Sequence, residues 1–214
     1  MESFAPKKRR RRLLSLDLIL DTAIGLARSE GLSGVSMPSV SRSLGTTPMS
    51  LYKHVGNKEA LVLQMLDRAT SMVDVPSRQD DPAEEVMIVF EAVHGMLRRD
   101  PWTVEHFLKG YGGAEPVREL ISRSLMALNG LGLERGEAWQ AHQALLRYTY
   151  GEALAAEASA KGGLRYGDVD DAPTEADETI REFENAAPAE QPDERYRETL
   201  QRYLRSVIDE VGSD

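Results

Sequence analysis

Apolar residues recur at intervals of three and four along most of this chain, which is the period of an amphipathic α-helix. The first stripe lies between Ser15, a good N-cap, and Gly31. Its members are Leu16, Ile19, Leu20, Ala23, Leu26 and Ala27. A second, two-turn stripe lies between Ser36 and Gly45, and its members are Met37, Val40 and Leu44. The pattern predicts two helices here, each opened by a serine and closed by a glycine.

Two further helix starts follow the turn at Gly45. Thr47 is suited to cap a helix in which Pro48 takes the first position, where its missing N–H costs little. Asn57 is suited to cap a longer helix that runs to about Val73. Short helices joined by a glycine turn of about four residues form a helix-turn-helix.

The helix after Thr47 is expected to have one buried and one exposed side. We expect Leu44 and Leu51 to face a small core. The residues left on the exposed rim are Pro48, Met49, Ser50, Tyr52, Lys53 and His54.

The rest of the chain also follows the helical period. The segment VDVPSRQDDP at 73–82, rich in proline and aspartate, separates the two parts. Helix patterns then follow at about 82–99, 102–107, 116–130, 134–161, 174–183 and 193–211, with a loop at 162–172 and a linker at 186–191. We expect Asp81 to begin the first of these with capping-box spacing to Glu84, and Asp193 to cap the last. With no strand alternation and no internal repeat, the predicted fold class is all-α.

Length and composition narrow the class of protein. At 214 residues and 41% hydrophobic content, the chain is long enough for one small and one larger globular domain. It has no run near eighteen apolar residues, and KKRRRR leads into an amphipathic helix rather than an apolar export signal, so we expect a cytoplasmic protein. The absence of cysteine excludes disulfides, thiolate nucleophiles and cysteine-based zinc sites.

Charge is distributed unevenly along the chain. The whole chain carries −9, but residues 1–58 carry a net +6 and the other 156 residues carry −15. A basic end on an acidic body concentrates attraction for a polyanion at one face. The arm contributes six consecutive cations, Lys7, Lys8, Arg9, Arg10, Arg11 and Arg12. We expect a disordered, solvated tail in the free protein, which on DNA can follow the phosphates or enter the minor groove.

The order of residues from the LG turn onward resembles the N-terminal domain of the TetR family of bacterial transcription regulators. That family follows a pattern of the form LG-x-[ST]-x-x-x-LY-x-[HY]-[FV]-x-[SN]-K-x-[AE]-L. The matching residues are Leu44, Gly45, Thr47, Leu51, Tyr52, His54, Val55, Asn57, Lys58, Ala60 and Leu61. The resemblance covers roughly the first 70 residues.

This resemblance implies an N-terminal three-helix helix-turn-helix domain followed by a helical-bundle ligand-binding and dimerisation domain. The bounds we expect are a basic arm at 1–14, a DNA-binding domain at 15–73 and the larger domain at 81–214. In that family the long eighth helix and the final helix of each subunit form a four-helix bundle across a two-fold axis, which the 134–161 and 193–211 segments would supply here. Packing of the same stripes inside one subunit is the alternative.

By the same resemblance, the rim is where DNA is read. Lys53 and Lys58 are candidates for phosphate contact, and Pro48 and Met49 offer apolar contact to a thymine methyl. The predicted DNA-binding residues are Arg42, Thr47, Pro48, Met49, Ser50, Tyr52, Lys53, His54 and Lys58. Many relatives carry Arg or Lys near the start of the preceding helix, where this chain has Met37-Pro38-Ser39, which puts a phosphate contact there in doubt.

The central segments mix aromatic rings with polar tips, as ligand pockets and ordinary helical cores both do. The candidate ligand-binding residues are Phe90, His94, Trp102, His106, Phe107, Tyr111, Trp139, Gln143 and Tyr148. His94 and His106 lack an HExxH motif, cysteines or an acidic pair at ligand spacing, so we assign no metal and no cofactor.

The sequence favours a regulator over an enzyme. It contains no G-x-S-x-G, P-loop or GxGxxG motif that would organise its histidines and carboxylates for catalysis. We therefore expect a cytoplasmic, homodimeric repressor that binds a palindromic operator in double-stranded DNA and is released by a small-molecule effector. The alternative from the same residues is a DNA-binding architectural or interaction module without a ligand.

Overall fold

The structure, a computed structural model, describes residues 14–160, 162, 174–186 and 192–211. Every regular element in these ranges is helical, which confirms the predicted all-α class. Tertiary contacts divide the chain into two compact units, which meet along the sequence between Arg68 and Ala69. Residues 1–13 of the predicted basic arm at 1–14, with all six of its consecutive cations, lie outside the described residues, as do the loop at 163–172 and the linker residues 187–191.

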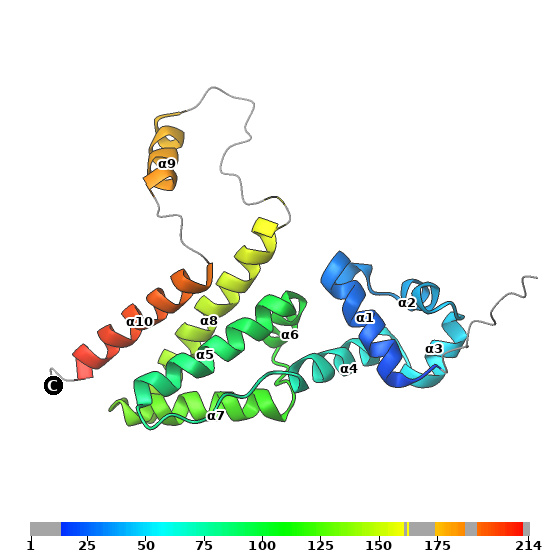
Figure 1. Cartoon of the computed structure of the whole chain (residues 1–214), viewed down its shortest axis with the longest axis horizontal. Helices are drawn as coiled ribbons and strands as arrows, with labels where there is room; N and C mark the ends of the chain where they lie inside the picture. Colours follow the sequence, from blue (N-terminus) through cyan, green and yellow to red (C-terminus); the bar gives the residue numbers. More distant parts are fainter. Residues whose placement is uncertain (1–13, 161, 163–173, 187–191, 212–214) are drawn as a thin grey trace, which may run out of the picture. The chain divides into compact units, whose positions relative to one another are not determined.

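Unit 1 is built from short capped helices (Figure 1). Its elements are α1 (Leu16–Glu30), η1 (Leu32–Gly34), α2 (Met37–Leu44), α3 (Pro48–Val55) and most of α4 (Lys58–Ser71). Ser15 accepts a first-turn N–H of α1, and Ser36 forms a reciprocal capping box with Ser39 at α2. Asn57 Oδ1 accepts a hydrogen bond from Ala60 N at 2.8 Å and so caps α4. The predicted starts of these helices are confirmed.

The apolar stripes of α1 to α4 form the core of unit 1. Its fully buried members include Ile19, Ala23, Val35, Val40, Leu51, Leu61 and Met65. At the surface, Arg68 of α4 binds two carboxylates of α1. Its Nε and Nη2 donate to the two oxygens of Asp21 at 2.6 and 3.1 Å, and its Nη1 donates to Asp17 at 3.0 Å. The ion pair therefore joins the first and last helices of the unit.

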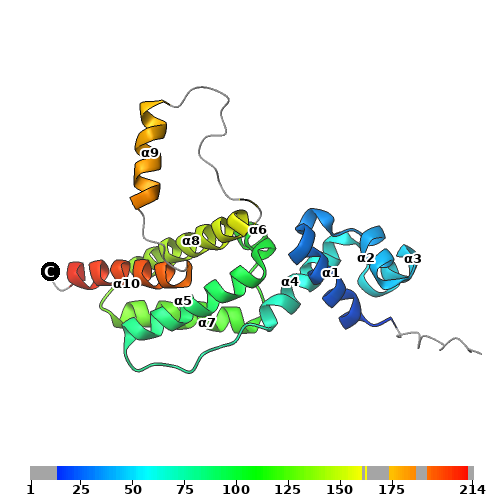
Figure 2. The ribbon, with the colours of Figure 1, turned by 45° about the horizontal axis from the view of Figure 1, so that its top comes forward.

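Unit 2 is a helical bundle with α5 at its centre. Its elements are α5 (Pro82–Arg99), η2 (Pro101–Thr103), α6 (Val104–Leu108), α7 (Glu115–Gly130), α8 (Arg135–Ala160), α9 (Glu175–Ala186) and α10 (Pro192–Val211). Figures 1 and 2 both show α5, α7, α8 and α10 side by side, and α5 packs against each of the other three. None of the described helices is long and apolar enough to cross a lipid bilayer.

The apolar stripe of α10 is buried inside its own subunit. Tyr196, Leu200 and Leu204 belong to one core cluster with residues of α5, α7 and α8. Ala153, in the small-residue half of α8, belongs to a second cluster with residues of α5 and α7. These side chains of α8 and α10 therefore pack inside one subunit, which was the alternative to a bundle between subunits. A contact between subunits would use other residues of α8 and α10.

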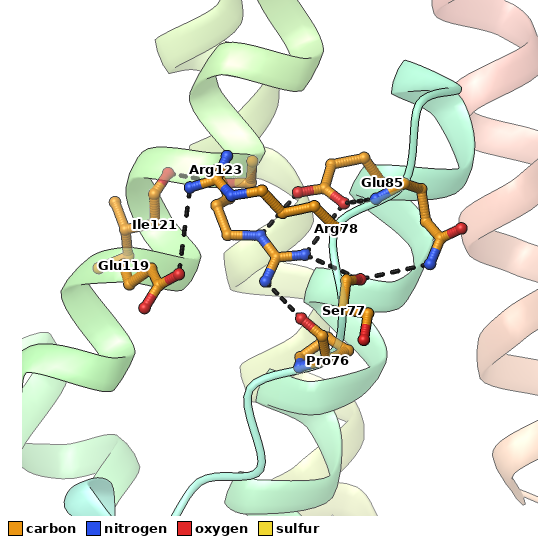
Figure 3. A network of polar contacts seen from close by, with 9 residues as sticks. Pro76, Ser77, Arg78, Glu85, Glu119, Ile121 and Arg123 are labelled. Carbon is orange, nitrogen blue, oxygen red and sulfur yellow. Dashed lines mark hydrogen bonds and ion pairs between the residues drawn. The ribbon is translucent and has the colours of Figure 1, made fainter.

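A buried ion pair holds the segment between α4 and α5 (Figure 3). The Arg123 side chain is 1% exposed, and its Nε and Nη2 donate to the two Glu85 oxygens at 2.6 and 3.0 Å. Arg123 also donates to the carbonyl oxygens of Pro76 at 2.6 Å and Ser77 at 3.3 Å, while Glu85 accepts from Gln79 N at 2.8 Å. One pair of charges therefore joins α5, α7 and an irregular segment whose backbone would otherwise lack these partners.

Two helix starts differ in detail from the prediction. Asp81 caps α5 through Ala83 N at 2.8 Å, whereas the capping-box spacing predicted the N–H of Glu84. The last helix begins at Pro192, so Asp193 lies in its first turn instead of capping it. Helix ends depend on local competition for a few N–H groups, which the apolar period does not specify.

Candidate nucleic-acid interface and ligand cavity

A short turn at residues 45–47 fixes the direction of α3 after α2. Gly45 has φ +64° and ψ +35°, in the left-handed region that favours glycine. The next N–H, that of Thr46, donates to Ser41 O at 2.9 Å and closes α2. Thr47 Oγ1 then accepts from Ser50 N at 3.3 Å and lies 3.0 Å from Ser50 Oγ, which opens α3. These hydrogen bonds make the helix-turn-helix that the sequence predicted.

One face of α3 is anchored in the core of unit 1 and the other is exposed. Leu51 and Val55 are buried, whereas Met49 is 68% and Tyr52 46% exposed. We call the predicted surface residues the α3 rim; its members are Pro48, Met49, Ser50, Tyr52, Lys53 and His54. All of them are exposed except Ser50, which is half-buried and bound to Thr47. The buried contacts of Leu51 and Val55 fix the orientation of this short, capped helix, so the α3 rim faces solvent.

Exposed cations precede and follow the α3 rim in the sequence. Arg42 in the last turn of α2, Lys53 on the rim and Lys58 in the first turn of α4 are all exposed. Residues 37–55 contain no Asp or Glu that would neutralise them. The first-turn N–H groups of α4 also favour an anion next to Lys58. By contrast, the start of α2 offers a buried Met37 and a Ser39 that is engaged in the capping box, so it presents no cation.

Unit 2 contains a small cavity of about 40 Å³ between α5, α6, α7 and α8. Its wall is apolar except for one imidazole and one phenol. The lining residues are Val89, Phe90, Val93, Met96 and Leu97 of α5, Phe107 of α6, Val117, Leu120 and Ile121 of α7, and His142, Leu146 and Tyr150 of α8. Of the nine predicted ligand-binding residues, Phe90 and Phe107 line this cavity.

The other seven predicted residues lie elsewhere in unit 2. Trp139 and Tyr111 are largely exposed, and Gln143 is half-buried. Trp102 is buried and donates its indole N–H to the carboxylate of Asp100 at 3.1 Å. His106 is also buried, beside the Trp102 and Tyr111 rings.

The last two predicted ligand-binding residues, His94 and Tyr148, belong to a column of stacked rings. Tyr196 of α10 stacks on His94 with a centroid distance of 3.8 Å and on Tyr148 with one of 5.6 Å. The Tyr196 hydroxyl lies 2.9 Å from Thr149 Oγ1 and donates to Phe90 O at 3.2 Å. This column packs α10 onto the bundle and does not border the cavity.

His142 and Tyr150 supply the polar groups of the cavity, and neither was among the predicted residues. His142 is 3% exposed and its Nδ1 lies 2.7 Å from Ser124 Oγ. Burial lowers the pKa of His142 to about 4 and raises the pKa of Tyr150 to about 12, so both are uncharged near pH 7. The sequence does contain a pattern that could have identified them. His142, Leu146 and Tyr150 recur every four residues and therefore share one face of α8.

The last turn of α4 is attached to the cavity wall. α4 ends at Ser71, two residues before the predicted end, and its residues 69–71 belong to unit 2. Ala114 N donates to Thr70 Oγ1 at 2.9 Å. A Cβ at Gly113 would lie 3.3 Å from a ring carbon of Phe107 and 3.5 Å from the methyl group of Thr70. Gly113, at φ +69°, therefore lets a cavity-lining ring and α4 approach the same loop.

The N-terminal part of the chain matches a known protein family. Residues 19–65 match the family described as bacterial regulatory proteins, tetR family. Over 94 residues, 43% of this chain, the sequence is 35% identical to the HTH-type transcriptional repressor DrrR1 of Streptomyces coeruleorubidus. The chain covers 35% of the length of that repressor.

Solved structures match the fold over nearly the whole chain. The TetR family protein ActR of Streptomyces coelicolor, in complex with actinorhodin, is 22% identical with a TM-score of 0.68, over 93% of this chain and 99% of ActR. BioQ of Mycobacterium smegmatis is 15% identical with a TM-score of 0.64, over 92% of this chain and 98% of BioQ. A structure of BioQ with its double-stranded DNA operator has a TM-score of 0.60 at 14% identity, over 91% of this chain and 98% of that one. At these identities the likeness concerns the fold.

Proposed function

We propose, from the premise that this chain belongs to the TetR family of bacterial regulatory proteins, that it is a DNA-binding transcriptional regulator. The observation that carries the proposal is the α3 rim, an exposed helix face behind a fixed turn, with exposed cations before and after it in the sequence. A helix held in this way enters the major groove. There Tyr52 and Lys53 contact phosphates or base edges, Met49 contacts thymine methyl groups, and Arg42 and Lys58 contact the flanking phosphates.

The regulator acts as a homodimer on a palindromic operator, because two-fold symmetry places two recognition helices about one DNA turn, roughly 34 Å, apart. Unit 2 offers exposed apolar side chains for the interface on the two helices that the resemblance assigns to it: Trp139 and Leu154 on α8 and Ile208 on α10. The BioQ structure with its operator supports DNA as the partner. The match to a named repressor supports repression.

A small molecule releases the operator. The apolar cavity of unit 2 is the candidate effector site, and the ActR complex with actinorhodin supports a ligand in this fold. A ligand that moves Phe107 presses on the loop at Gly113 and Ala114, which is bonded to Thr70. Because Thr70 lies in the last turn of α4, this displacement passes along the helix into unit 1 and separates the recognition helices. In the same proposal, the cations at 7–12 add phosphate contacts, and the regulator works in the cytoplasm.

The test begins by sequencing the genomic DNA fragments that the protein retains, which identifies the operator. We expect Tyr52→Ala with Lys53→Ala to weaken operator binding roughly 100-fold, since each rim contact contributes about 1–3 kcal/mol. Fluorescence anisotropy of labelled operator at fixed salt measures the loss, and far-UV circular dichroism checks the fold.

A matched control removes the same residue types from unit 2. Tyr111→Ala with Lys109→Ala changes an exposed tyrosine and an exposed lysine, and operator affinity should stay within about twofold of wild type. Wild-type affinity in the rim variant would rule out the α3 rim as the DNA-binding surface.

A further inference from the structure

The cavity of unit 2 holds a histidine with one committed and one uncommitted nitrogen. His142 is the only titratable nitrogen base among the residues that line the cavity. Within the described part of the chain, its one hydrogen bond joins Nδ1 to Ser124 Oγ at 2.7 Å. Nε2 makes no hydrogen bond within the described residues, and the imidazole is part of the cavity wall.

The single hydroxyl proton of Ser124 is the basis on which we assign the tautomer of His142. A serine hydroxyl has one proton, and Ser124 donates it to the carbonyl oxygen of Ile121 at 2.9 Å. The 2.7 Å contact with His142 Nδ1 does not itself set a direction; with the serine proton assigned to Ile121, Ser124 Oγ accepts from His142 and the imidazole proton lies on Nδ1. In a neutral imidazole the other nitrogen is an acceptor, so Nε2 presents a lone pair.

The wall of the cavity disfavours a charged ligand. None of the lining residues is Lys, Arg, Asp or Glu. Burial holds the pKa of His142 near 4 and that of Tyr150 near 12, so neither side chain supplies a charge near pH 7. A carboxylate or ammonium ion placed here would lose its hydration and gain no counter-charge.

Two lining rings favour a flat guest. Phe107 of α6 and Tyr150 of α8 lie parallel within 3°, with centroids 6.3 Å apart. Stacking a ring between two others takes about 7 Å between their planes, twice the usual contact distance of about 3.5 Å. The separation of the Phe107 and Tyr150 planes is at most their centroid distance, so the two rings must move apart to admit a third. Both side chains are half-buried, so a small outward movement is less restricted than in the fully buried part of the wall.

The size of the cavity requires such a movement. About 40 Å³ is far below the roughly 300–1,000 Å³ of ordinary ligand pockets. Three of the residues that would have to shift, Phe107, Ile121 and Leu146, are half-buried. Phe107 also lies beside Gly113, so a ligand that displaces this ring would act on the Gly113 loop.

We propose that the effector is an uncharged, planar aromatic molecule that carries a hydroxyl or N–H donor, and that His142 Nε2 accepts the hydrogen bond from this donor. The inference rests on the proposed function and specifies the ligand class of its effector site. Ser124 acts as a positioning residue, because it fixes the proton of the imidazole on Nδ1.

Three naphthalene probes separate the features of this class. With the full chain and no DNA, isothermal titration calorimetry at pH 7 is run with 2-naphthol, 2-methoxynaphthalene and 2-naphthoate. We expect 2-naphthol to bind about tenfold more tightly than 2-methoxynaphthalene, which lacks the donor, and 2-naphthoate to bind more weakly than either. Leu146→Ala enlarges the cavity and should tighten 2-naphthol binding while its preference over the methyl ether remains.

Two histidine variants test whether the preference for 2-naphthol over 2-methoxynaphthalene comes from His142 Nε2. His142→Phe keeps a ring and removes the acceptor, so the two neutral probes should bind within about threefold of each other. His94→Phe changes a buried histidine that does not line the cavity and should keep the tenfold preference. If circular dichroism finds His142→Phe unfolded, Ser124→Ala replaces it, since an unfixed imidazole proton should also reduce the preference to about threefold.

The results also separate this inference from the proposed function. Equal affinity for the two neutral probes, tightest binding of 2-naphthoate, or no binding of any probe to both wild type and Leu146→Ala would overturn the ligand class. Each of these leaves operator binding by the α3 rim intact. If the rim variant instead bound the operator with wild-type affinity in the anisotropy experiment, the proposed function would fail, and the preference for 2-naphthol over 2-methoxynaphthalene would be unchanged.

Discussion

Each unit contains an arginine that binds a carboxylate on a distant helix, but the two pairs differ in burial. In unit 1 the Arg68 side chain is 30% exposed and its partners Asp17 and Asp21 more so. In unit 2 Arg123 and Glu85 are 1% and 8% exposed. Water screens the first pair and replaces its hydrogen bonds when it breaks, whereas a broken buried pair leaves a charge in a poorly hydrated interior. Similar geometry therefore predicts very different consequences.

The two candidate sites, the α3 rim in unit 1 and the cavity in unit 2, also differ in burial. The α3 rim and the cations Arg42 and Lys58 come from one stretch, 42–58, and all of them except the half-buried Ser50 are exposed. The cavity takes its wall from four helices between residues 89 and 150, and most of that wall is buried. A surface for a polyanion needs accessible charge, while a cavity for a neutral ring needs charge to be absent.

The largest expected effect is the loss of the buried pair. Arg123→Ala should destabilise unit 2 by about 3–5 kcal/mol, because Glu85 is left buried without a counter-charge. Both tryptophans, Trp102 and Trp139, belong to unit 2, so tryptophan fluorescence during urea unfolding reports on this unit. Arg123→Met combined with Glu85→Met should lose less than Arg123→Ala alone; an equal or greater loss would contradict the explanation by unpaired charge.

The next effect is a dependence on pH that comes from buried histidine. Burial lowers the pKa of His142 from 6.5 to about 4, so between these values the unfolded chain binds a proton that the folded chain does not. Stability is therefore complete above about pH 6.5 and falls as the pH falls. From pH 7 to pH 5 the loss should be about 2 kcal/mol.

Urea unfolding followed by tryptophan fluorescence at the two pH values measures this loss. His142→Phe should flatten most of the dependence, and the remainder should come from His94, whose pKa burial also lowers. Arg123 holds the pKa of Glu85 below its usual range, so this carboxylate contributes only at lower pH. A pH dependence of unchanged size in His142→Phe would exclude His142 as its main source.

The smallest expected effect is the loss of the exposed pair. Arg68→Ala should cost unit 1 less than about 1 kcal/mol, because solvent screens the charges it removes. Unit 1 has no tryptophan, so far-UV circular dichroism is the measurement, and high salt should shrink the difference from wild type. A loss close to that of Arg123→Ala would show that burial is not what distinguishes the two pairs.

The local elements of this chain were open to prediction, because the side chains that specify them lie within a few residues of each other. Ser36 caps α2, Gly45 ends it and Thr47 caps α3 through contacts within one helical turn. The exposure of Met49 and Tyr52 follows from the same helical period that buries Leu51. The α3 rim was therefore readable from the sequence, apart from the engagement of Ser50 with Thr47.

The cavity was not readable in the same way. Aromatic residues were recognised as a group, but the period of one helix does not say which helix lies opposite. Trp139 and Tyr111 face outward, Tyr148 stacks on a ring 48 residues away, and His142 borders the cavity instead. Asp193 bonds to Arg98 of α5, a partner that its place near a helix start does not indicate.

By itself, the sequence determined the helices, their caps, the exposed face of α3 and the concentration of positive charge near the N-terminus. All of these depend on short-range geometry and on counts of charge. Only the tertiary structure decided that Arg123 pairs with Glu85, that Ser124 Oγ lies against His142 Nδ1, and that Phe107 and Thr70 meet at Gly113. The two residues of each pair lie 18 to 38 positions apart in the sequence. Packing between helices brings them together, and the apolar stripe of a single helix does not encode that packing.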